Sequence, residues 1–425
     1  MRSALLGPVL LALALRLVAV VATDRVVADV ERYQRVAGHL LDVSWNPYET
    51  KRLFPYPPPW AAAEATAEWL ARRGVGSFPV NVKVPILAAD LLLVALLAAA
   101  AGAGRASPLA PWLYAVHPVS LLVGGVHGQF DAIPLLFLLL ATEALLRGRR
   151  DASALALAAA IGTKSFPVLA LPFLAFGARA SWRSAARYAA LALGPGALLL
   201  LPFAIADFGA LRRELFAYGG IADFGWTGVL RGAEWLASGA LPRSEARFWP
   251  VASLLSKALF LAAWAGLVFA VRSGRLRLGV ERAILATMLA FSALYGLLSA
   301  QYMLWAVPFG LLWPGRPADS SSPGETKLLG MTGRAEPMSA GAALHAAAAT
   351  AGLVGFYLFL APGVLFPVPL AGETALLAGR LWLGGAAATL AASCFWLATV
   401  VREGRDSGLR AATDASERPS ISPSR

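Results

Sequence analysis

The amino-acid sequence predicts an all-α, polytopic membrane protein with about twelve transmembrane helices. Hydrophobic residues make up 58% of the 425 residues, and the mean hydropathy is +0.63. Segments of mostly apolar residues recur along the chain, and helices of about 20 residues can cross a hydrocarbon core of about 30 Å. These segments lack the alternation of polar and apolar residues that the strands of a membrane β-barrel show.

The expected transmembrane helices follow the apolar runs in order along the chain. When the N-terminus is cytoplasmic, the arginines of the short loops fall on the cytoplasmic side, as the positive-inside rule requires. This pattern predicts an integral membrane protein with cytoplasmic N- and C-termini, and the Ala-, Gly- and Arg-rich composition favours a bacterial plasma membrane. The spans are expected at 3–22, 83–104, 111–126, 131–147, 152–163, 166–178, 187–206, 250–271, 280–298, 302–314, 339–361 and 375–400.

The distribution of charge argues against a nucleic-acid partner, and the cysteine count excludes an internal disulfide. The formal net charge is +12, but the basic residues are spread over loops between apolar runs, so they act as topology signals and predict no nucleic-acid partner. The single cysteine, Cys394, lies in an apolar run and cannot form an internal disulfide.

Two loops on the expected outer face are long. Residues 23–82 and 207–249 combine aromatic residues with prolines or mixed charges, which is typical of amphipathic helices at a membrane interface. The chain is expected to divide into a transmembrane module, a flexible cytoplasmic linker, two C-terminal transmembrane helices and a disordered cytoplasmic tail, at 1–314, 315–338, 339–400 and 401–425 respectively.

Several expected spans are too short to cross the membrane. The runs 152–163 and 166–178 rise only about 18 Å each. The turn between them carries Lys164 and is therefore expected inside the outer leaflet, where it must be buried in protein or line a watery cavity. The short run 302–314 places Gln301 at a similar depth.

Two further charges are expected at this depth, Arg16 in the first span and Asp90 in the second. With Lys164 and Gln301 they predict one polar layer. One interpretation is a cavity open to the outer face, in which Arg16 and Lys164 bind an anion such as a lipid phosphate. The alternative is an ion pair of Asp90 with Arg16 or Lys164 that only neutralises charge.

Carboxylates gather just after the first span, at Asp24, Asp29 and Glu31, and Tyr33 follows them. A carboxylate beside an apolar wall can act as a general base. The alternative for each of them is an ordinary solvated loop charge.

The string from His127 to Pro134 places an imidazole, a carboxamide and a carboxylate between two apolar runs. Polar side chains in such positions are functional candidates. His127 and Asp131, four residues apart, offer two possible metal ligands, which is weak support for a metal site. Asp131 also stands where it could cap the following helix.

Four features together resemble the GT-C superfamily of integral-membrane glycosyltransferases. The chain is most similar to the bacterial polyprenol-phosphate-mannose-dependent mannosyltransferases and, more distantly, to GPI mannosyltransferase I. The features are the acidic-then-tyrosine string after the first span, Asn46-Pro47-Tyr48 followed by Tyr56-Pro57-Pro58-Pro59, the string from His127 to Pro134, and Gln301-Tyr302 with Trp305 and Pro308.

The resemblance implies a GT-C-like fold, with residues 1–314 as the catalytic module, and an inverting transfer of a hexose, most simply mannose, from a polyprenyl-phosphate sugar to an acceptor hydroxyl. It implies a first-loop base, for which Asp29 is the first choice and Asp24 and Glu31 are the reserves. Arg16 and Lys164 would stabilise the leaving phosphate. The other substrate-binding residues that it implies are Tyr33, Asp90, His127, Gln129, Asp131, Gln301 and Tyr302.

The implied partners are the polyprenyl-phosphate sugar donor, membrane lipids, and a glycolipid, glycan or protein acceptor. The sequence specifies no cofactor, and the role of a divalent metal stays open because no Asp-x-Asp motif is present. Three alternatives remain: the same chemistry with arabinose or glucose, a lipid or sugar transporter, and a non-enzymatic assembly partner.

Overall fold

The computed structural model describes residues 2–26, 28–51, 53–177, 180–215, 219–312, 339–365 and 369–416. Regular structure within these residues is helical, with only isolated β-bridges, so the predicted all-α class is confirmed. The expected linker at 315–338 lies outside the described residues. The last helix continues to Ser416, into the segment 401–425 for which a disordered tail was expected.

Helices account for each of the predicted apolar runs. The α-helices are α1 (Arg2–Ala22), α2 (Ala28–Asp42), α3 (Pro58–Arg72), α4 (Phe78–Gly102), α5 (Ala110–Ala115), α6 (Pro118–Ser120), α7 (Ala132–Leu146), α8 (Arg150–Thr163), α9 (Leu171–Ala175), α10 (Trp182–Leu215), α11 (Gly225–Ser238), α12 (Pro250–Arg272), α13 (Val280–Leu294), α14 (Val307–Gly310), α16 (Ala340–Phe359), α17 (Pro362–Leu365) and α18 (Gly372–Ser416). The π-helical segment is η2 (Leu121–His127), and the 3-10 segments are η1 (Pro47–Glu49), η3 (Phe166–Ala170), η5 (Ala246–Phe248) and η6 (Ala300–Leu304).

Fewer helices than the predicted twelve are long enough to cross a membrane. Among the described residues, the five that are long and apolar enough are α4, α10, α12, α16 and most of α18. The predicted spans 111–126, 166–178 and 302–314 are instead chains of short helical pieces. Prolines at the starts of α5, α6, η3, α9 and α14 explain these breaks, because proline cannot continue a preceding helix.

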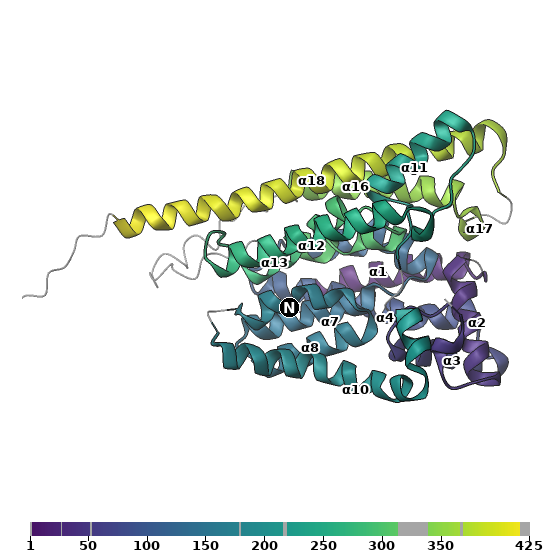
Figure 1. Cartoon of the computed structure of the whole chain (residues 1–425), viewed down its shortest axis with the longest axis horizontal. Coiled ribbons are helices and arrows are strands. Elements are labelled where there is room, and N and C mark those ends of the chain that lie inside the picture. Colours follow the sequence, from purple (N-terminus) through teal and green to yellow (C-terminus); the bar gives the residue numbers. More distant parts are fainter. Residues whose placement is uncertain are drawn as a thin grey trace, which may run out of the picture.

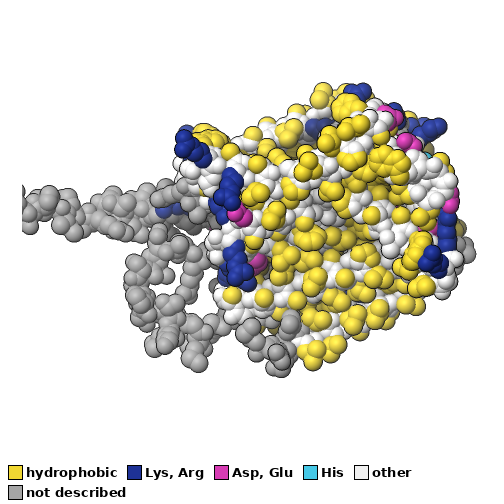
Figure 2. Space-filling view, turned by 90° about the horizontal axis from the view of Figure 1, so that it is seen from below, with side chains coloured by type: hydrophobic (Ala, Val, Ile, Leu, Met, Phe, Trp, Pro, Cys, Tyr) yellow, Lys and Arg dark blue, Asp and Glu magenta, His cyan; other side chains and the backbone are white. Residues whose placement is uncertain are grey.

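The long helices lie side by side along the longest axis of the molecule, as Figure 1 shows. The short helices α2, α3 and α17 gather at one end, and the C-terminal part of α18 projects from the other. Apolar side chains cover the middle of the face in Figure 2, while most of its Lys and Arg side chains lie towards the two ends. This distribution suits an integral membrane protein, since the hydrocarbon core excludes charge.

The packing of α16 against α18 depends on glycine. A Cβ on Gly385 of α18 would overlap the backbone of Gly352 in α16, so the two helices approach closely at this point. Such contacts between small residues are a common way to associate helices in membranes. The neighbouring Gly384 has open space around its missing Cβ.

We predict that Gly385→Ala destabilises the protein by about 1–3 kcal/mol, because the added methyl group forces the helices apart. Gly384→Ala is the matched control, and it should be neutral or raise stability slightly through helix propensity. Thermal unfolding in detergent measures both. Equal melting temperatures for the two variants would contradict the close approach.

Candidate functional site

The polar string from His127 to Pro134 begins at the end of the π-helical segment η2, and the chain turns out of this helix at Gly128. This residue ends η2 with a φ of +81°, a left-handed conformation that favours glycine. A Cβ at this position would lie 3.1 Å from Lys83 Cε and 3.2 Å from Val30 Cγ2. The turn is therefore both tightly bent and tightly packed, and it places His127 and Gln129 against α2.

Lys83 of α4 fixes this turn. Its ammonium donates to the carbonyl oxygen of Val126 at 3.0 Å, and to the carbonyl and hydroxyl oxygens of Thr23 at 3.1 and 2.8 Å. The residue is 1% exposed, so these three bonds replace the water that a lysine needs. Sequence reasoning missed Lys83, because a lysine at the start of an apolar run looks like a surface charge.

Asp29, in the first turn of α2, is the centre of the first polar cluster. Its Oδ2 lies 3.1 Å from His127 Nε2 and accepts a hydrogen bond from Gln129 Nε2. Arg32 lies 3.5 Å from its Oδ1. The other imidazole nitrogen, His127 Nδ1, lies 3.0 Å from the Tyr357 hydroxyl of α16. The structure thus brings together Asp29, His127 and Gln129, three residues that the sequence singled out.

The surroundings of Asp29 favour its charged form. Burial raises the pKa of the carboxyl, but the hydrogen bond and charge of His127, with smaller contributions from Arg32 and Gln129, lower the pKa to about 2. The side chain remains 21% exposed. Asp29 is therefore an ionised carboxylate that a substrate can reach at neutral pH.

Asp131 and Lys164 form the second polar cluster. Lys164 Nζ donates to Asp131 Oδ2 at 2.7 Å, and the Trp305 indole donates to Oδ1 at 2.6 Å. Asp131 is fully buried, and the Lys164 side chain is 9% exposed. Asp131 precedes α7 but makes no side-chain hydrogen bond that caps it, so the capping interpretation is wrong. The partner of Lys164 is Asp131, and not Asp90 as one alternative proposed.

An aromatic wall separates and covers the two clusters. Phe130 stacks on Trp60 with ring centroids 4.0 Å apart, and edges of Tyr56 and Tyr33 contact it at 4.8 and 6.2 Å. The Lys164 ammonium lies 4.8 Å from the Phe130 centroid, within the range of a cation–π interaction. The first outer loop therefore shields the charged side chains from water, which strengthens their interactions. Tyr33 itself is buried here.

Arg16 and Asp90 form a separate, closed pair. Arg16 Nε donates to Asp90 Oδ2 at 3.0 Å, and its other nitrogens bond to the Ala115 carbonyl and the Ser120 hydroxyl. The Tyr114 hydroxyl donates to the second Asp90 oxygen at 2.7 Å. Both charged residues are 1% exposed. The structure does not bring Arg16 into contact with Lys164. The contacts of Arg16 match the alternative interpretation, an ion pair with Asp90 that only neutralises charge.

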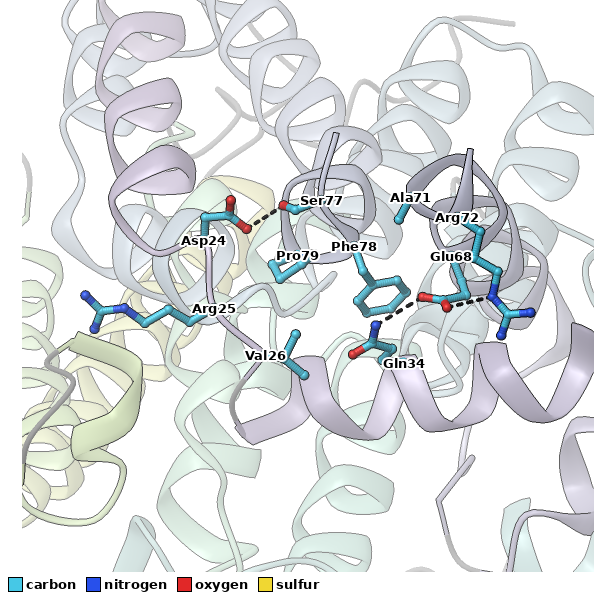
Figure 3. A pocket seen from close by; sticks show the side chains of 10 residues that line it. All are labelled: Asp24, Arg25, Val26, Gln34, Glu68, Ala71, Arg72, Ser77, Phe78 and Pro79. Carbon is cyan, nitrogen blue, oxygen red and sulfur yellow. Dashed lines mark hydrogen bonds and ion pairs between the residues drawn. The ribbon is translucent and has the colours of Figure 1, made fainter. Parts of the chain in front are cut away.

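The two reserve carboxylates lie away from the Asp29 cluster. Glu31 is half exposed and pairs with Arg35 at 2.5 Å on the outer side of α2. Asp24 accepts a hydrogen bond from Ser77, the residue that caps α4. Figure 3 shows Asp24 at the edge of an open pocket of about 380 Å³, with Glu68 and its partner Arg72 on the opposite wall. Of the predicted site residues, this pocket contains Asp24 alone.

Gln301 and Tyr302 lie on η6, the segment that delivers Trp305 to Asp131. Gln301 is 6% exposed. The Tyr302 ring packs on the Trp305 ring, with centroids 4.6 Å apart, and Trp305 stacks on Phe166 at 3.7 Å. The segment therefore packs against the Asp131–Lys164 cluster through Trp305.

The second outer loop and the last two long helices supply residues that the sequence analysis missed. Asp223 pairs with Arg231 at 2.7 Å, and the Trp382 indole of α18 donates to the Asp223 carbonyl at 2.8 Å. Tyr357 of α16 contacts His127. The string around Asp223 carries a weak signal, an acidic residue between glycines and aromatics, which did not stand out among the other loop charges.

Glu64 of α3 is a further buried carboxyl behind the aromatic wall. It is completely buried, and neither of its oxygens has a hydrogen-bond partner within the part of the chain that the structure describes. Burial raises the pKa of Glu64 well above its usual value, against the opposing effects of Trp60 and Arg32. The surroundings of Glu64 therefore favour its protonated, neutral form.

The described residues contain no group of three or more His, Cys, Asp or Glu side chains arranged to hold a metal ion. The pair of His127 and Asp131 that the sequence offered as metal ligands does not form. Because the chain turns at Gly128, the two side chains contact different partners, Asp29 and Lys164.

The chain matches no protein-family model and no curated protein sequence. Among solved structures, it is similar to the crystal structure of ArnT from Cupriavidus metallidurans bound to undecaprenyl phosphate. The identity is 18% and the TM-score is 0.39, and the match covers 93% of this chain and 78% of that one. This similarity is too remote to show what this chain does.

We predict that Glu64→Gln raises the melting temperature, and that the gain grows as the pH rises from 5 to 8. Because the pKa of Glu64 is raised in the folded chain, the unfolded chain releases this proton at lower pH than the folded chain does, and folding stability falls as the pH rises above 4.5. Glutamine removes this dependence. The exposed Glu31→Gln is the control, and a pH-independent gain in Glu64→Gln would contradict the neutral carboxyl.

Proposed function

We propose that the protein transfers a hexose, most simply mannose, from a polyprenyl-phosphate sugar to an acceptor hydroxyl at the outer face of the membrane. The proposal rests mainly on one observation, the presence of two clusters of charged side chains in an apolar helical protein. Asp29 with His127 and Gln129 forms one cluster, and Asp131 with Lys164 forms the other. Buried charges in such surroundings are costly, so they are functional candidates by default.

The second cluster supports binding of the lipid phosphate. Within the described residues Lys164 Nζ makes one hydrogen bond, to Asp131, and it lies 5.5 and 4.8 Å from the ring centroids of Tyr56 and Phe130, which leaves two of its three donors for a ligand. Arg32, one-third exposed beside Asp29, adds a second cation. A phosphate leaving group needs such positive charge more than it needs a general acid. Arg16 is left with a structural role, because its donors are already bonded to Asp90 and its neighbours.

The first cluster supports the reaction itself. Asp29 accepts the proton of the acceptor hydroxyl as the oxygen attacks the anomeric carbon, and polyprenyl phosphate leaves from the opposite side with inversion. His127 and Gln129 hold the carboxylate in place and offer polar atoms to the sugar hydroxyls. Tyr33 and the other rings of the aromatic wall shield the reacting centre from water.

We predict that Asp29→Asn lowers transfer by a factor of about 10² to 10⁴, the usual contribution of a general base. The assay mixes purified protein, radiolabelled polyprenyl-phosphate mannose and a membrane lipid extract. Glu31→Gln on the same helix is the matched control, because Glu31 pairs with Arg35 at the surface and should be dispensable. Full activity in Asp29→Asn would move the base elsewhere, and absence of transfer in the wild type would contradict the mannosyl proposal.

We predict that Lys164→Gln weakens binding of polyprenyl phosphate about tenfold or more, since it removes a charge-assisted hydrogen bond. The single change leaves the Asp131 carboxylate buried without its cation, which is expected to destabilise the fold. The double variant Lys164→Gln/Asp131→Asn avoids this problem. If the double variant folds and binds the lipid as tightly as the wild type, Lys164 does not hold the phosphate.

A further inference from the structure

The open pocket of Figure 3 takes no part in the proposed reaction. It is built from the residues that follow α1, from α2 and α3, and from the start of α4. Its volume is about 380 Å³. Small-molecule sites occupy about 300–1,000 Å³, so the pocket is large enough for a ligand of that class. It lies at the end of the molecule where α2 and α3 gather, which is also the end that carries Asp29.

The polar side chains on one wall of the pocket are fixed by one another. Glu68 accepts a hydrogen bond from Gln34 Nε2 at 3.1 Å and another from Arg72 Nε at 2.8 Å, as Figure 3 shows. Arg72 also donates to both carboxylate oxygens of Asp42 at 2.7 Å. A wall whose polar groups are already held in place can bind a ligand without first having to order them.

The charges of the pocket balance. Its lining includes two carboxylates, Asp24 and Glu68, and two guanidinium groups, Arg25 and Arg72. Arg25 donates to the Leu365 carbonyl oxygen of α17 at 3.3 Å, and Arg72 is bonded to carboxylates, so both cations already have partners in the protein. The pocket therefore favours a neutral ligand that donates hydrogen bonds to carboxylate and carboxamide oxygens, as hydroxyl groups do.

Apolar surface completes the pocket. Val26 is 43% exposed at its edge, and Ala71, Phe78 and Pro79 also line it. A sugar ring carries C–H groups on its faces and hydroxyl groups around its rim, so it matches a pocket that offers both kinds of surface. An anionic ligand would have to compete with the protein for each guanidinium group. The chemistry of the lining thus points to a neutral sugar.

The pocket lies next to the first polar cluster. The buried Lys83 ammonium is 3.1 Å from the Thr23 carbonyl oxygen and 3.0 Å from the Val126 carbonyl oxygen. The next residues along the chain are Asp24, at the edge of the pocket, and His127, in the first polar cluster. One ammonium group therefore ties the edge of the pocket to the cluster that contains the proposed base.

We propose that this pocket binds the non-reacting sugars of a neutral oligosaccharide acceptor, and this proposal rests on the proposed function. Val26 lines the pocket and Asp29 follows it by three residues, so their Cα atoms are at most about 11 Å apart. A short oligosaccharide covers this span, with its reacting hydroxyl at Asp29 and its next sugars against Gln34 and Glu68. The acceptor class that the pocket selects is a glycan and not a protein side chain.

The experiment compares two soluble acceptors, methyl α-mannoside and α-1,6-mannotriose, in transfer from polyprenyl-phosphate mannose. We expect the KM for the trisaccharide to be at least about tenfold lower, since only the trisaccharide gains hydrogen bonds in the pocket. Ala71→Phe fills the pocket and should raise the KM for the trisaccharide to that for the monosaccharide. Ala62→Phe, at an exposed position of the same helix outside the pocket, is the matched control and should keep the difference.

Saturation-transfer NMR of the full chain in detergent, with mannotriose as the probe, reports binding without transfer. If Ala71→Phe does not fold, Glu68→Gln should weaken this binding about tenfold, and the surface variant Glu31→Gln should not. Transfer with equal KM values for the two acceptors, or an unchanged difference in Ala71→Phe, would overturn the pocket and leave the proposed function intact. Binding that Ala71→Phe abolishes, without transfer by the wild type, would support the pocket and contradict the proposed function. Neither binding nor transfer would overturn both.

Discussion

The carboxylate of Asp131 is fully buried in an apolar helical protein, and the arrangement of the site depends on how its charge is stabilised. Lys164 and the Trp305 indole supply the two hydrogen bonds. They come from the end of α8 and from η6, so burial of this one charge fixes three chain segments together. An unpaired carboxylate here would be strongly unfavourable, and each partner is therefore needed for the fold.

The helices break where the buried charges need polar partners inside the protein. Short helical pieces that start at prolines lie around 111–126, 166–178 and 302–314. The breaks between them place polar backbone and side-chain groups inside the protein, where a continuous apolar helix would place none. Non-helical backbone at membrane depth is tolerated when it is buried in protein or lines a cavity. In this protein these breaks deliver Ser120, Lys164 and Trp305 to the charged residues. The irregular segments therefore provide the polar groups, and the long helices provide the apolar surroundings.

The sequence predicted the helical class and several residues of the candidate site, because charged residues are rare in apolar runs and are easily singled out. It identified Asp29, His127, Gln129, Asp131 and Lys164, which the structure gathers into two clusters. It could not predict their partners, since pairing across the fold leaves no trace in a single sequence. Trp305 binds Asp131 from 174 residues away, and Tyr357 contacts His127 from 230 residues away. Glu64 and Asp223 were missed because a loop carboxyl looks the same whether it is buried or solvated.

The account is tested most directly by determining the structure with polyprenyl phosphate bound. It predicts that the phosphate oxygens lie within hydrogen-bond distance of Lys164 Nζ, on the side of Phe130 that faces Asp131. It also predicts that Asp29 borders the space beside the phosphate. A phosphate bound elsewhere, with Lys164 still bonded to Asp131 alone, would contradict the assignment of this site to a lipid-linked sugar donor.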